Sequence, residues 1–310
     1  MDIAVIGTGA IGGLYGARLA HGGNRVHFLL HTEYEYVKAH GLIVDSHLGD
    51  FSIKEPLVYD DISMMPRCDL VLFTAKSTAN DMLFPSIESV LKPGGVIALM
   101  QNGLGAEQKL AELYPECHVF GGMCFVCAYR ESPGVIRNPD DERVTFAPYD
   151  PADAILLPEV ANIFIKAGID TECFEDLSLA RWRKLMWNIP YNGMTVIMNC
   201  KTDFLVGDPA MRELIACLMR DVVEGARACG SVIDPGFADR MVGVTEQMTP
   251  YEPSMKLDYN AGRKLEIEAI YENPIRLAAE HGFTMHYANA VRLALHALER
   301  KQRETVLDIG

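Results

Sequence analysis

Asp2-Ile3-Ala4-Val5-Ile6 runs directly into Gly7-Thr8-Gly9-Ala10-Ile11-Gly12 at the start of the chain. The apolar run is typical of a buried strand, the glycines form a Gly-x-Gly-x-x-Gly turn, and a helical pattern follows. Strand, glycine turn and helix in this order open a dinucleotide-binding unit. A glycine at 7 permits the tight turn, one at 9 lets a pyrophosphate approach, and one at 12 lets the helix pack on the strand. Residues 7–12 are therefore predicted to hold the phosphates of a nucleotide.

The composition is that of an ordinary globular protein, and its length of 310 residues is enough for two domains. A net charge of −14 argues against a nucleic-acid partner, because phosphate backbones attract clustered positive charge. No apolar segment is long enough to cross a bilayer, so no membrane partner is expected. Residues 1–6 are typical of a strand and not of a leader peptide, so a cytoplasmic location is expected.

Cys124 and Cys127 form a Cys-x-x-Cys pair, a pattern compatible with a redox or metal site. They lie in an apolar run, residues 120–128, that is typical of a strand, where residues three apart point to opposite faces. No second pair or histidine cluster accompanies them. We expect structural cysteines here and no bound metal.

The first half of the chain alternates strand and helix patterns. Strands are predicted at residues 25–29, 70–74, 96–99 and 118–126, and helices at 9–21, 80–91 and 106–114. This alternation predicts a parallel, doubly wound sheet. Polar turns at 132–134 and 139–142 separate short strand-like runs, which predict antiparallel strands appended to that sheet. A further helix at 155–167 and a strand at 168–173 complete the domain.

The second half of the chain has almost only helical patterns. In the best of them, residues 208–229, Asp208 is a plausible N-cap, Pro209 fits the first helical position and Gly230 is placed to end the helix. Later helices are predicted at 237–248, 261–281 and 288–301. The fold class is therefore α/β, with a doubly wound domain at 1–174 and an all-α domain at 175–310.

Three polar residues at the start of the helical half are candidates for chemistry. Lys184, Asn188 and Asn192 have the spacing i, i+4, i+8, so on a continuous helix they share one face among apolar neighbours. A solvated stripe on an amphipathic helix explains the spacing equally well. Pro190 weakens the pattern because it removes a helical hydrogen bond.

With these motifs the chain resembles the ketopantoate reductases (2-dehydropantoate 2-reductases), which reduce a 2-keto acid with NADPH on the way to pantothenate and coenzyme A. The resemblance covers nearly the whole chain and rests on motifs in a fixed order. Besides residues 7–12 and 184–192, these are Phe73-Thr74-Ala75-Lys76, Gln101-Asn102-Gly103-Leu104-Gly105, and Pro253-Ser254-Met255 followed by Glu266. The resemblance implies a Rossmann-type domain and a helical domain like the C-terminal domain of 6-phosphogluconate dehydrogenase.

The resemblance also implies a role for each matching residue. Lys184 corresponds to the general acid that protonates the developing alkoxide, and Glu266 to the second essential residue, which orients the substrate and holds the lysine charge. Neutral donors suited to the substrate's carboxylate and hydroxyl are Asn102, Asn188, Asn192 and Ser254. Asn102 is also a cofactor candidate, and so is Lys76, which follows a strand; without the family context Lys76 is a surface lysine in a loop.

The preferred nicotinamide depends on the residues after the second strand, residues 25–29. The family's arginine for the 2′-phosphate of NADP corresponds to His31 here, which with Thr32 binds phosphate less firmly than an arginine. Glu33 either opposes a phosphate or points to water. NADP is expected from the family, and NAD stays open as the alternative.

Two other functions stay open at this point. The same machinery could act on another 2-keto acid or a 3-hydroxy acid, because the motifs leave the acyl group undefined. A protein that senses NADP without chemistry is the second alternative, although it has no need of Lys184 and Glu266. Apolar faces in the helical half are compatible with a homodimer.

Overall fold

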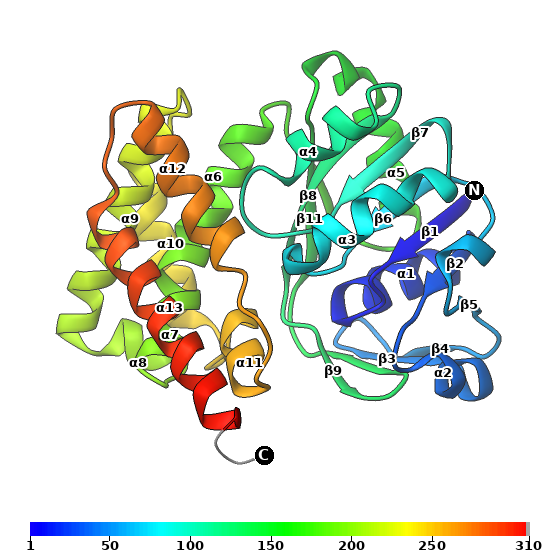
Figure 1. Cartoon of the computed structure of the whole chain (residues 1–310), viewed down its shortest axis with the longest axis horizontal. Helices are drawn as coiled ribbons and strands as arrows, with labels where there is room; N and C mark the ends of the chain where they lie inside the picture. The colour runs from blue at the N-terminus through cyan, green and yellow to red at the C-terminus, as the bar shows by residue number, and fades with distance from the viewer. Residues whose placement is uncertain (308–310) are drawn as a thin grey trace. The chain divides into compact units, whose positions relative to one another are not determined.

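The computed structural model describes residues 1–307, and these divide into two compact units (Figure 1). The first unit comprises Met1–Gln101 and Ala106–Leu177. The second unit comprises Ser178 and the residues after it, together with the short segment Asn102–Gly105. The segment that carries Asn102 thus belongs to the helical unit, although the chain on both sides of it belongs to the first.

An eight-stranded sheet forms the centre of the first unit, in the order β12-β11-β8-β7-β6-β1-β2-β5. Its strands are β1 (Asp2–Ile6), β2 (Arg25–Leu29), β5 (Leu57–Tyr59), β6 (Cys68–Phe73), β7 (Leu91–Leu99), β8 (His118–Val126), β11 (Glu142–Pro148) and β12 (Thr171–Cys173). All neighbouring strands are parallel except β8 and β11. The predicted parallel, doubly wound sheet is confirmed.

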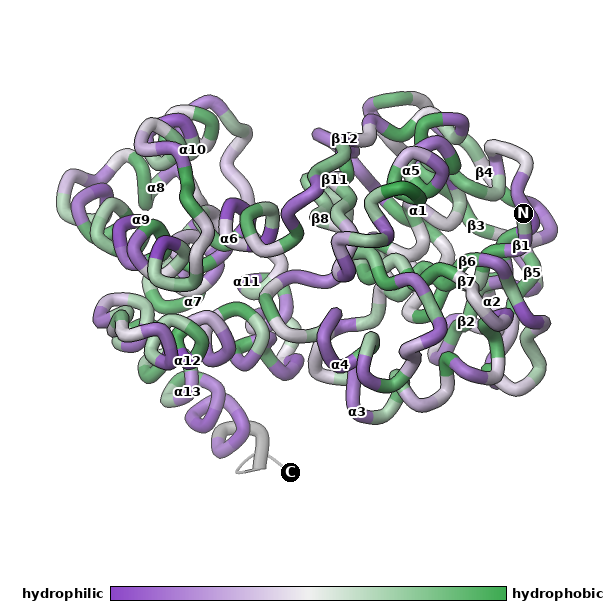
Figure 2. Tube along the Cα trace, turned by 90° about the horizontal axis from the view of Figure 1, so that it is seen from above, coloured by the Kyte–Doolittle hydropathy of each residue, from purple (hydrophilic) through white to green (hydrophobic). Residues whose placement is uncertain are grey.

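Helices cover both faces of this sheet, which explains why its inner strands are apolar without alternation. They are α1 (Ala10–His21), α2 (Tyr34–His40), α3 (Asn80–Leu83), α4 (Ala106–Leu113) and α5 (Leu157–Lys166), with 3₁₀ turns η1 (Ile62–Met64), η2 (Ser77–Ala79), η3 (Phe84–Ser89) and η4 (Pro151–Leu156). From β1, Ile3 and Val5 enter the core under α1 and α5, whereas Ala4 and Ile6 enter the core under η3 and α4. Figure 2 shows the apolar colour along the inner strands β1, β6 and β7.

A second, four-stranded sheet packs beside α1, and it corrects one prediction. Its order is β4-β3-β10-β9, with β3 (Leu42–Ser46), β4 (Phe51–Ile53), β9 (Tyr129–Ser132) and β10 (Val135–Asn138). The strands expected as additions to the main sheet are therefore divided: β11 joins it, whereas β9 and β10 do not. The reason is that β10 pairs in parallel with β3, a short strand that the sequence pattern did not reveal.

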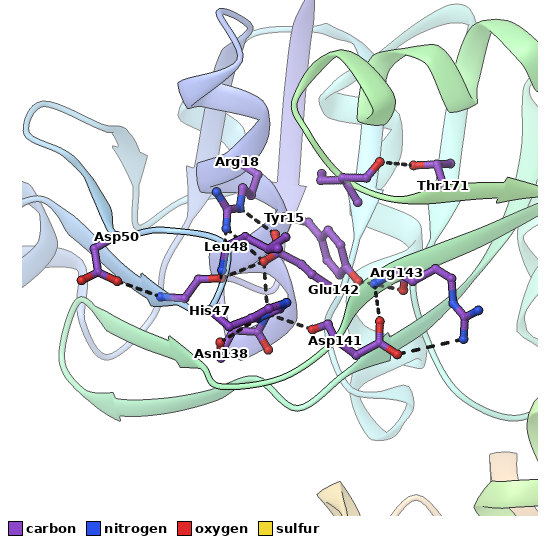
Figure 3. A network of polar contacts seen from close by, with 12 residues as sticks. Tyr15, Arg18, His47, Leu48, Asp50, Asn138, Asp141, Glu142, Arg143 and Thr171 are labelled. Carbon is purple, nitrogen blue, oxygen red and sulfur yellow. Dashed lines mark hydrogen bonds and ion pairs between the residues drawn. The ribbon is translucent and has the colours of Figure 1, made fainter. Parts of the chain in front are cut away.

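A buried polar network connects the four-stranded sheet to α1 and β11 of the first unit (Figure 3). The Arg18 guanidinium of α1 donates to both carboxylate oxygens of Glu142, at 2.6 and 3.1 Å. The Asn138 amide of β10 and the Ser46 hydroxyl of β3 each donate to Glu142 Oε2 at 3.1 Å. Both Glu142 oxygens and two of the three Arg18 nitrogens are hydrogen-bonded, which compensates the burial of the charge pair. Residues from α1, β3, β10 and β11 are joined at one carboxylate.

The described part of the second unit is all-α, as predicted. Its elements are α6 (Leu177–Trp187), α7 (Gly193–Ile197), α8 (Thr202–Gly207), α9 (Pro209–Ala228), α10 (Phe237–Gln247), α11 (Ser254–Asn260), α12 (Asn273–Glu280) and α13 (His286–Leu307), with π-helical turns η5 (Asn188–Asn192) and η6 (Glu268–Glu272). Asp208 caps α9 by accepting from the N–H groups of Ala210 and Met211, both at 3.0 Å. Gly230 follows α9 at a φ of 84°. Both predicted ends of this helix are confirmed.

Two predicted helices are wrong in their extent. The helix expected at 80–91 is divided into α3 and η3, because Pro85 lacks an N–H and disfavours α geometry before it. The helix expected at 261–281 is helical only from Ile267 onward and opens with the π-turn η6. No helix within residues 1–307 is both long and apolar enough to cross a membrane.

Candidate nucleotide and active-site residues

The glycine turn is packed tightly against the loop that follows β6. Gly7 has a φ of 95°, and a Cβ on it would collide with the backbone of Ala75. The Thr74 hydroxyl donates to the Gly7 carbonyl at 2.8 Å, and a Cβ on Gly12 would collide with that hydroxyl. Thr74 therefore holds the turn in place, a role that its position in the motif did not reveal.

Space for a pyrophosphate lies over the third residue of the turn. A Cβ on Gly9 would have only one heavy atom within reach, the Gly7 carbonyl oxygen at 4.0 Å. Helix α1 begins at the next residue with no side-chain cap and no acidic residue in its first turn. The N–H groups and the positive dipole end of α1 suit an anion, so the turn fits the diphosphate of a nicotinamide dinucleotide.

The remaining predicted residues of the turn differ in what they offer. Ala10 and Ile11 belong to the first turn of α1, where they contribute backbone N–H groups. The Thr8 hydroxyl donates to the Leu29 carbonyl at 2.8 Å. Thr8 thus ties the turn to the end of β2, the strand after which the adenosine ribose binds in such folds.

Lys76 lies exposed in the loop after β6, immediately before η2. The buried Gln101 side chain supports this loop by donating to the Ala75 carbonyl at 2.5 Å and to the Asn80 side chain at 2.7 Å. Asn80 donates back to Gln101 at 3.1 Å. Gln101 is therefore a structural support for Lys76, and only the resemblance pointed to it.

Glu33 has a partner that the sequence did not suggest. Arg130 of β9 places its Nε 2.9 Å from Glu33 Oε1, and the Gly134 N–H donates to Glu33 Oε2 at 3.2 Å. The Glu33 side chain is only 10% exposed, whereas His31 and Thr32 are exposed. From the sequence, Glu33 was expected either to oppose a phosphate or to point to water. In the structure its carboxylate is buried and paired with an arginine, which neither alternative included.

The second unit brings three predicted substrate residues into one chain of polar contacts, which ends beside the fourth, Ser254. The Asn188 side chain donates to Asn102 Oδ1, and the Asn192 side chain donates to Asn188 Oδ1, both at 3.2 Å. Asn192 Oδ1 accepts the N–H of Met255 at 3.2 Å, next to Ser254 at the start of α11. Asn188 and Asn192 are 2% and 1% exposed, so they are not a solvated stripe.

Lys184 and Glu266 belong to the same unit. Lys184 is half-buried in the last turn of α6, one turn before Asn188. Glu266 is 5% exposed and directly precedes the helical segment that contains η6. The second unit thus contains an ammonium, a buried carboxylate and a row of neutral amides. This is the set of groups that can bind a carboxylate and exchange a proton with a neighbouring oxygen.

The helix carrying these residues is not continuous, which corrects the expected geometry. The π-turn η5 interrupts it at Asn188–Asn192, where Pro190 supplies no N–H. The hydroxyl of Tyr271 donates to the Ile189 carbonyl at 2.8 Å within this turn. Single π-turns in α-helices are frequent at functional sites.

Cys124 lies half-buried in β8 and Cys127 is buried just after it, and neither forms a disulfide. Residues 1–307 contain no group of three histidine, cysteine or acidic side chains arranged to hold a metal ion. The pair was predicted to be structural, and its position in the core of the first unit is compatible with that role.

Known proteins resemble this chain along its whole length. Residues 3–151 match the family model described as "Ketopantoate reductase PanE/ApbA", and residues 176–299 match its C-terminal counterpart. A 2-dehydropantoate 2-reductase of Nostoc sp. is 39% identical over 99% of this chain and 98% of its own length. The crystal structure of 2-dehydropantoate 2-reductase from Geobacter metallireducens has a TM-score of 0.93 and 35% identity, covering 96% of this chain and 99% of that one.

A more distant structure has the same fold. D-mandelate dehydrogenase, solved with NADH and anilino(oxo)acetate, has a TM-score of 0.87 at 20% identity and covers 98% of this chain and 99% of its own. At this identity the likeness concerns the fold alone.

Proposed function

This chain belongs to the ketopantoate reductase family, and on that premise we propose that it reduces ketopantoate to pantoate with NADPH, for pantothenate and coenzyme A biosynthesis. In this proposal residues 1–174 form the dinucleotide-binding domain and residues 175–310 the catalytic domain. The observation that carries it is the buried chain of amides from Asn102 to the Met255 N–H, with Lys184 one helical turn before it.

Each group of the second unit has a task in this reduction. Bound NADPH supplies the hydride that reaches the carbonyl carbon of the keto acid. Negative charge then develops on the carbonyl oxygen, and Lys184 Nζ stabilises it and donates the proton that completes the hydroxyl. Glu266 orients that hydroxyl and holds the ammonium charge. The neutral donors of Asn102, Asn188, Asn192 and Ser254 bind the carboxylate and hydroxyl without adding charge beside the lysine. Asn102 is also proposed to contact the cofactor.

In this proposal glycines 7, 9 and 12 with the N-terminus of α1 hold the diphosphate that NADP and NAD share, and Lys76 adds a positive charge. The surroundings of Glu33 support NADP over NAD. An acidic side chain after β2 favours NAD by accepting from the ribose hydroxyls. Here the Glu33 side chain is only 10% exposed, and its charge is balanced by Arg130, so it is a weaker acceptor for ribose hydroxyls than a free acidic side chain. His31 and Thr32 are left as the groups for a 2′-phosphate.

A panel of 2-keto acids tested with both cofactors decides the proposed function. Oxidation of the nicotinamide is followed by absorbance, with ketopantoate beside smaller, larger and aromatic 2-keto acids. We expect the highest kcat/KM for ketopantoate with NADPH. A higher kcat/KM for another keto acid would identify that acid as the substrate instead, and a higher kcat/KM with NADH would identify NAD as the cofactor. Tight NADPH binding without turnover of any keto acid would show that the protein is an NADP sensor and not a reductase.

A further inference from the structure

We infer that Tyr271 is a positioning residue for this reaction: its hydroxyl is inserted into the helix that carries Lys184, Asn188 and Asn192, and it maintains the π-turn that aligns them. The inference rests on the proposed function, because it concerns residues assigned there to acid catalysis and substrate binding. Tyr271 itself is assigned no contact with substrate or cofactor.

The hydroxyl of Tyr271 replaces a backbone hydrogen bond of the helix. In an α-helix the Gly193 N–H would donate to the Ile189 carbonyl, four residues earlier. Here the Ile189 carbonyl accepts from Tyr271 Oη at 2.8 Å, and the Gly193 N–H hydrogen-bonds the Tyr271 hydroxyl. A side chain inserted into the hydrogen-bond ladder is a recognised cause of such interruptions.

Glycine at 193 makes this insertion possible. A Cβ on Gly193 would collide with Tyr271 Oη and crowd Val291 at 2.5 Å. The Tyr271 side chain is fully buried, and burial raises the pKa of its hydroxyl far above the ordinary value. The hydroxyl therefore keeps its proton, and its donation to the Ile189 carbonyl persists across the whole working pH range.

The π-turn changes which residues share a face. On an uninterrupted α-helix, residues eight apart such as Lys184 and Asn192 are separated by about 80° around the axis. One π-turn adds a residue to a single turn, which rotates the residues after it back by about 100°. The two positions then lie within about 20° of each other. The bond between Asn192 Nδ2 and Asn188 Oδ1 agrees with this alignment.

The turn that carries Tyr271 also supports the other proposed site segments. The Ala269 carbonyl of η6 accepts the Leu104 N–H at 3.0 Å, and Asn273 donates to the Leu104 carbonyl at 2.8 Å. These two bonds attach the segment that contains Asn102 to η6 and to the first residue of α12. Glu266 lies five residues before Tyr271. A single π-turn, η6, thus connects the Asn102 segment, the Glu266 segment and the helix of Lys184.

The test compares Tyr271→Phe with Tyr15→Phe in the full-length protein. Tyr15 is a matched control, because it is also fully buried and its hydroxyl donates to a backbone carbonyl, that of Arg143 at 3.2 Å, in the first unit. We expect both variants to lower Tm. Only Tyr271→Phe is expected to lower kcat for the keto acid, by about 10- to 100-fold, with an unchanged Kd for NADPH.

A double variant separates alignment from general destabilisation. If Tyr271 acts through Asn192, adding Tyr271→Phe to Asn192→Ala lowers kcat little further. A folded Tyr271→Phe variant with wild-type kcat, or full additivity with Asn192→Ala, overturns the inference. If Tyr271→Phe does not fold, Gly193→Ala provides the test, since its Cβ displaces the hydroxyl, and a wild-type kcat in that variant contradicts the inference equally.

Failure of the proposed function gives a different result. A wild-type protein that reduces no keto acid overturns that function and leaves the structural part to be tested by a crystal structure of Tyr271→Phe. Residues 188–192 in regular α-helix would support the inference, and an unchanged π-turn would overturn it.

Discussion

The contact between Arg130 and Glu33 changes the effect that Glu33 is expected to have on cofactor binding. From the sequence, an acidic residue two positions after His31 counts against a phosphate there. In the structure its carboxylate is bound by an arginine from β9, almost a hundred residues away along the chain. No local pattern could reveal this partner, because it depends on the parallel pairing of β10 with β3, which brings the β9–β10 hairpin to this end of the unit.

Replacing Arg130 should therefore change the cofactor preference. Arg130→Ala leaves the Glu33 carboxylate with the Gly134 N–H alone, so its negative charge opposes a 2′-phosphate and its oxygen can accept from a ribose hydroxyl. We expect the ratio of kcat/KM for NADPH to that for NADH to fall about 10-fold, equivalent to about 1.4 kcal/mol. Arg137→Ala is the control, since Arg137 of β10 is equally exposed and pairs with Asp45 and Glu131. An equal ratio in Arg130→Ala and wild type would contradict this account.

At the scale of elements, the predictable parts are those whose pattern arises from their own residues. The strand and helix around residues 2–21 were predicted because a strand buried on both faces is apolar throughout and the turn needs its glycines. Strand β4 was missed because it has only three residues, and β3 because one of its faces is exposed and its last two residues are polar. The turn η5 could not be predicted, since Tyr271, which is inserted there, is about eighty residues away.

Helix α9 gives a prediction that belongs to this scale. Asp208 accepts two N–H groups at its start, so Asp208→Ala leaves both without a side-chain partner. We expect the free energy of unfolding to fall by about 1 kcal/mol, measured with urea, and Asp208→Ser to restore most of it. Asp239→Ala removes the same charge from the first turn of α10, where no side chain caps the helix, and should have a smaller effect. Equal losses in the two alanine variants would show that charge and not capping matters.

At the scale of the whole molecule, each unit has its own hydrophobic core, and the assignment of Asn102–Gly105 to the helical unit could not be read from the sequence. The motif itself was recognisable, but its place in the fold depends on bonds to η6. The predicted roles of Lys184, Glu266 and the cofactor residues remain predictions, because they concern molecules that bind to the protein.

The pH dependence of unfolding has a specific expected source. His27 is buried between Tyr59, whose hydroxyl lies 3.0 Å from Nδ1, and Asp2, 3.7 Å from Nε2. Burial lowers the pKa of His27 despite the opposing effect of Asp2, and Arg25 lowers it further. As pH falls below about 6.5, the unfolded chain binds a proton at this residue before the folded protein does, so stability decreases.

We therefore expect Tm to fall more between pH 7 and pH 5 in wild type than in His27→Gln. The exposed His40→Gln serves as control and should follow wild type. Parallel curves for wild type and His27→Gln would show that His27 does not contribute to acid sensitivity.

Single-turnover reduction by the Lys184→Ala variant tests the central claim most directly. Enzyme loaded with NADPH is mixed with excess ketopantoate, and loss of the reduced nicotinamide is followed in time, beside a separate measurement of the Kd for NADPH. We predict that the reduction rate falls by about 10²- to 10⁴-fold while the Kd for NADPH stays nearly unchanged, since Lys184 is proposed to act on the keto oxygen. A reduction rate equal to that of wild type would contradict the assignment of Lys184 as the acid.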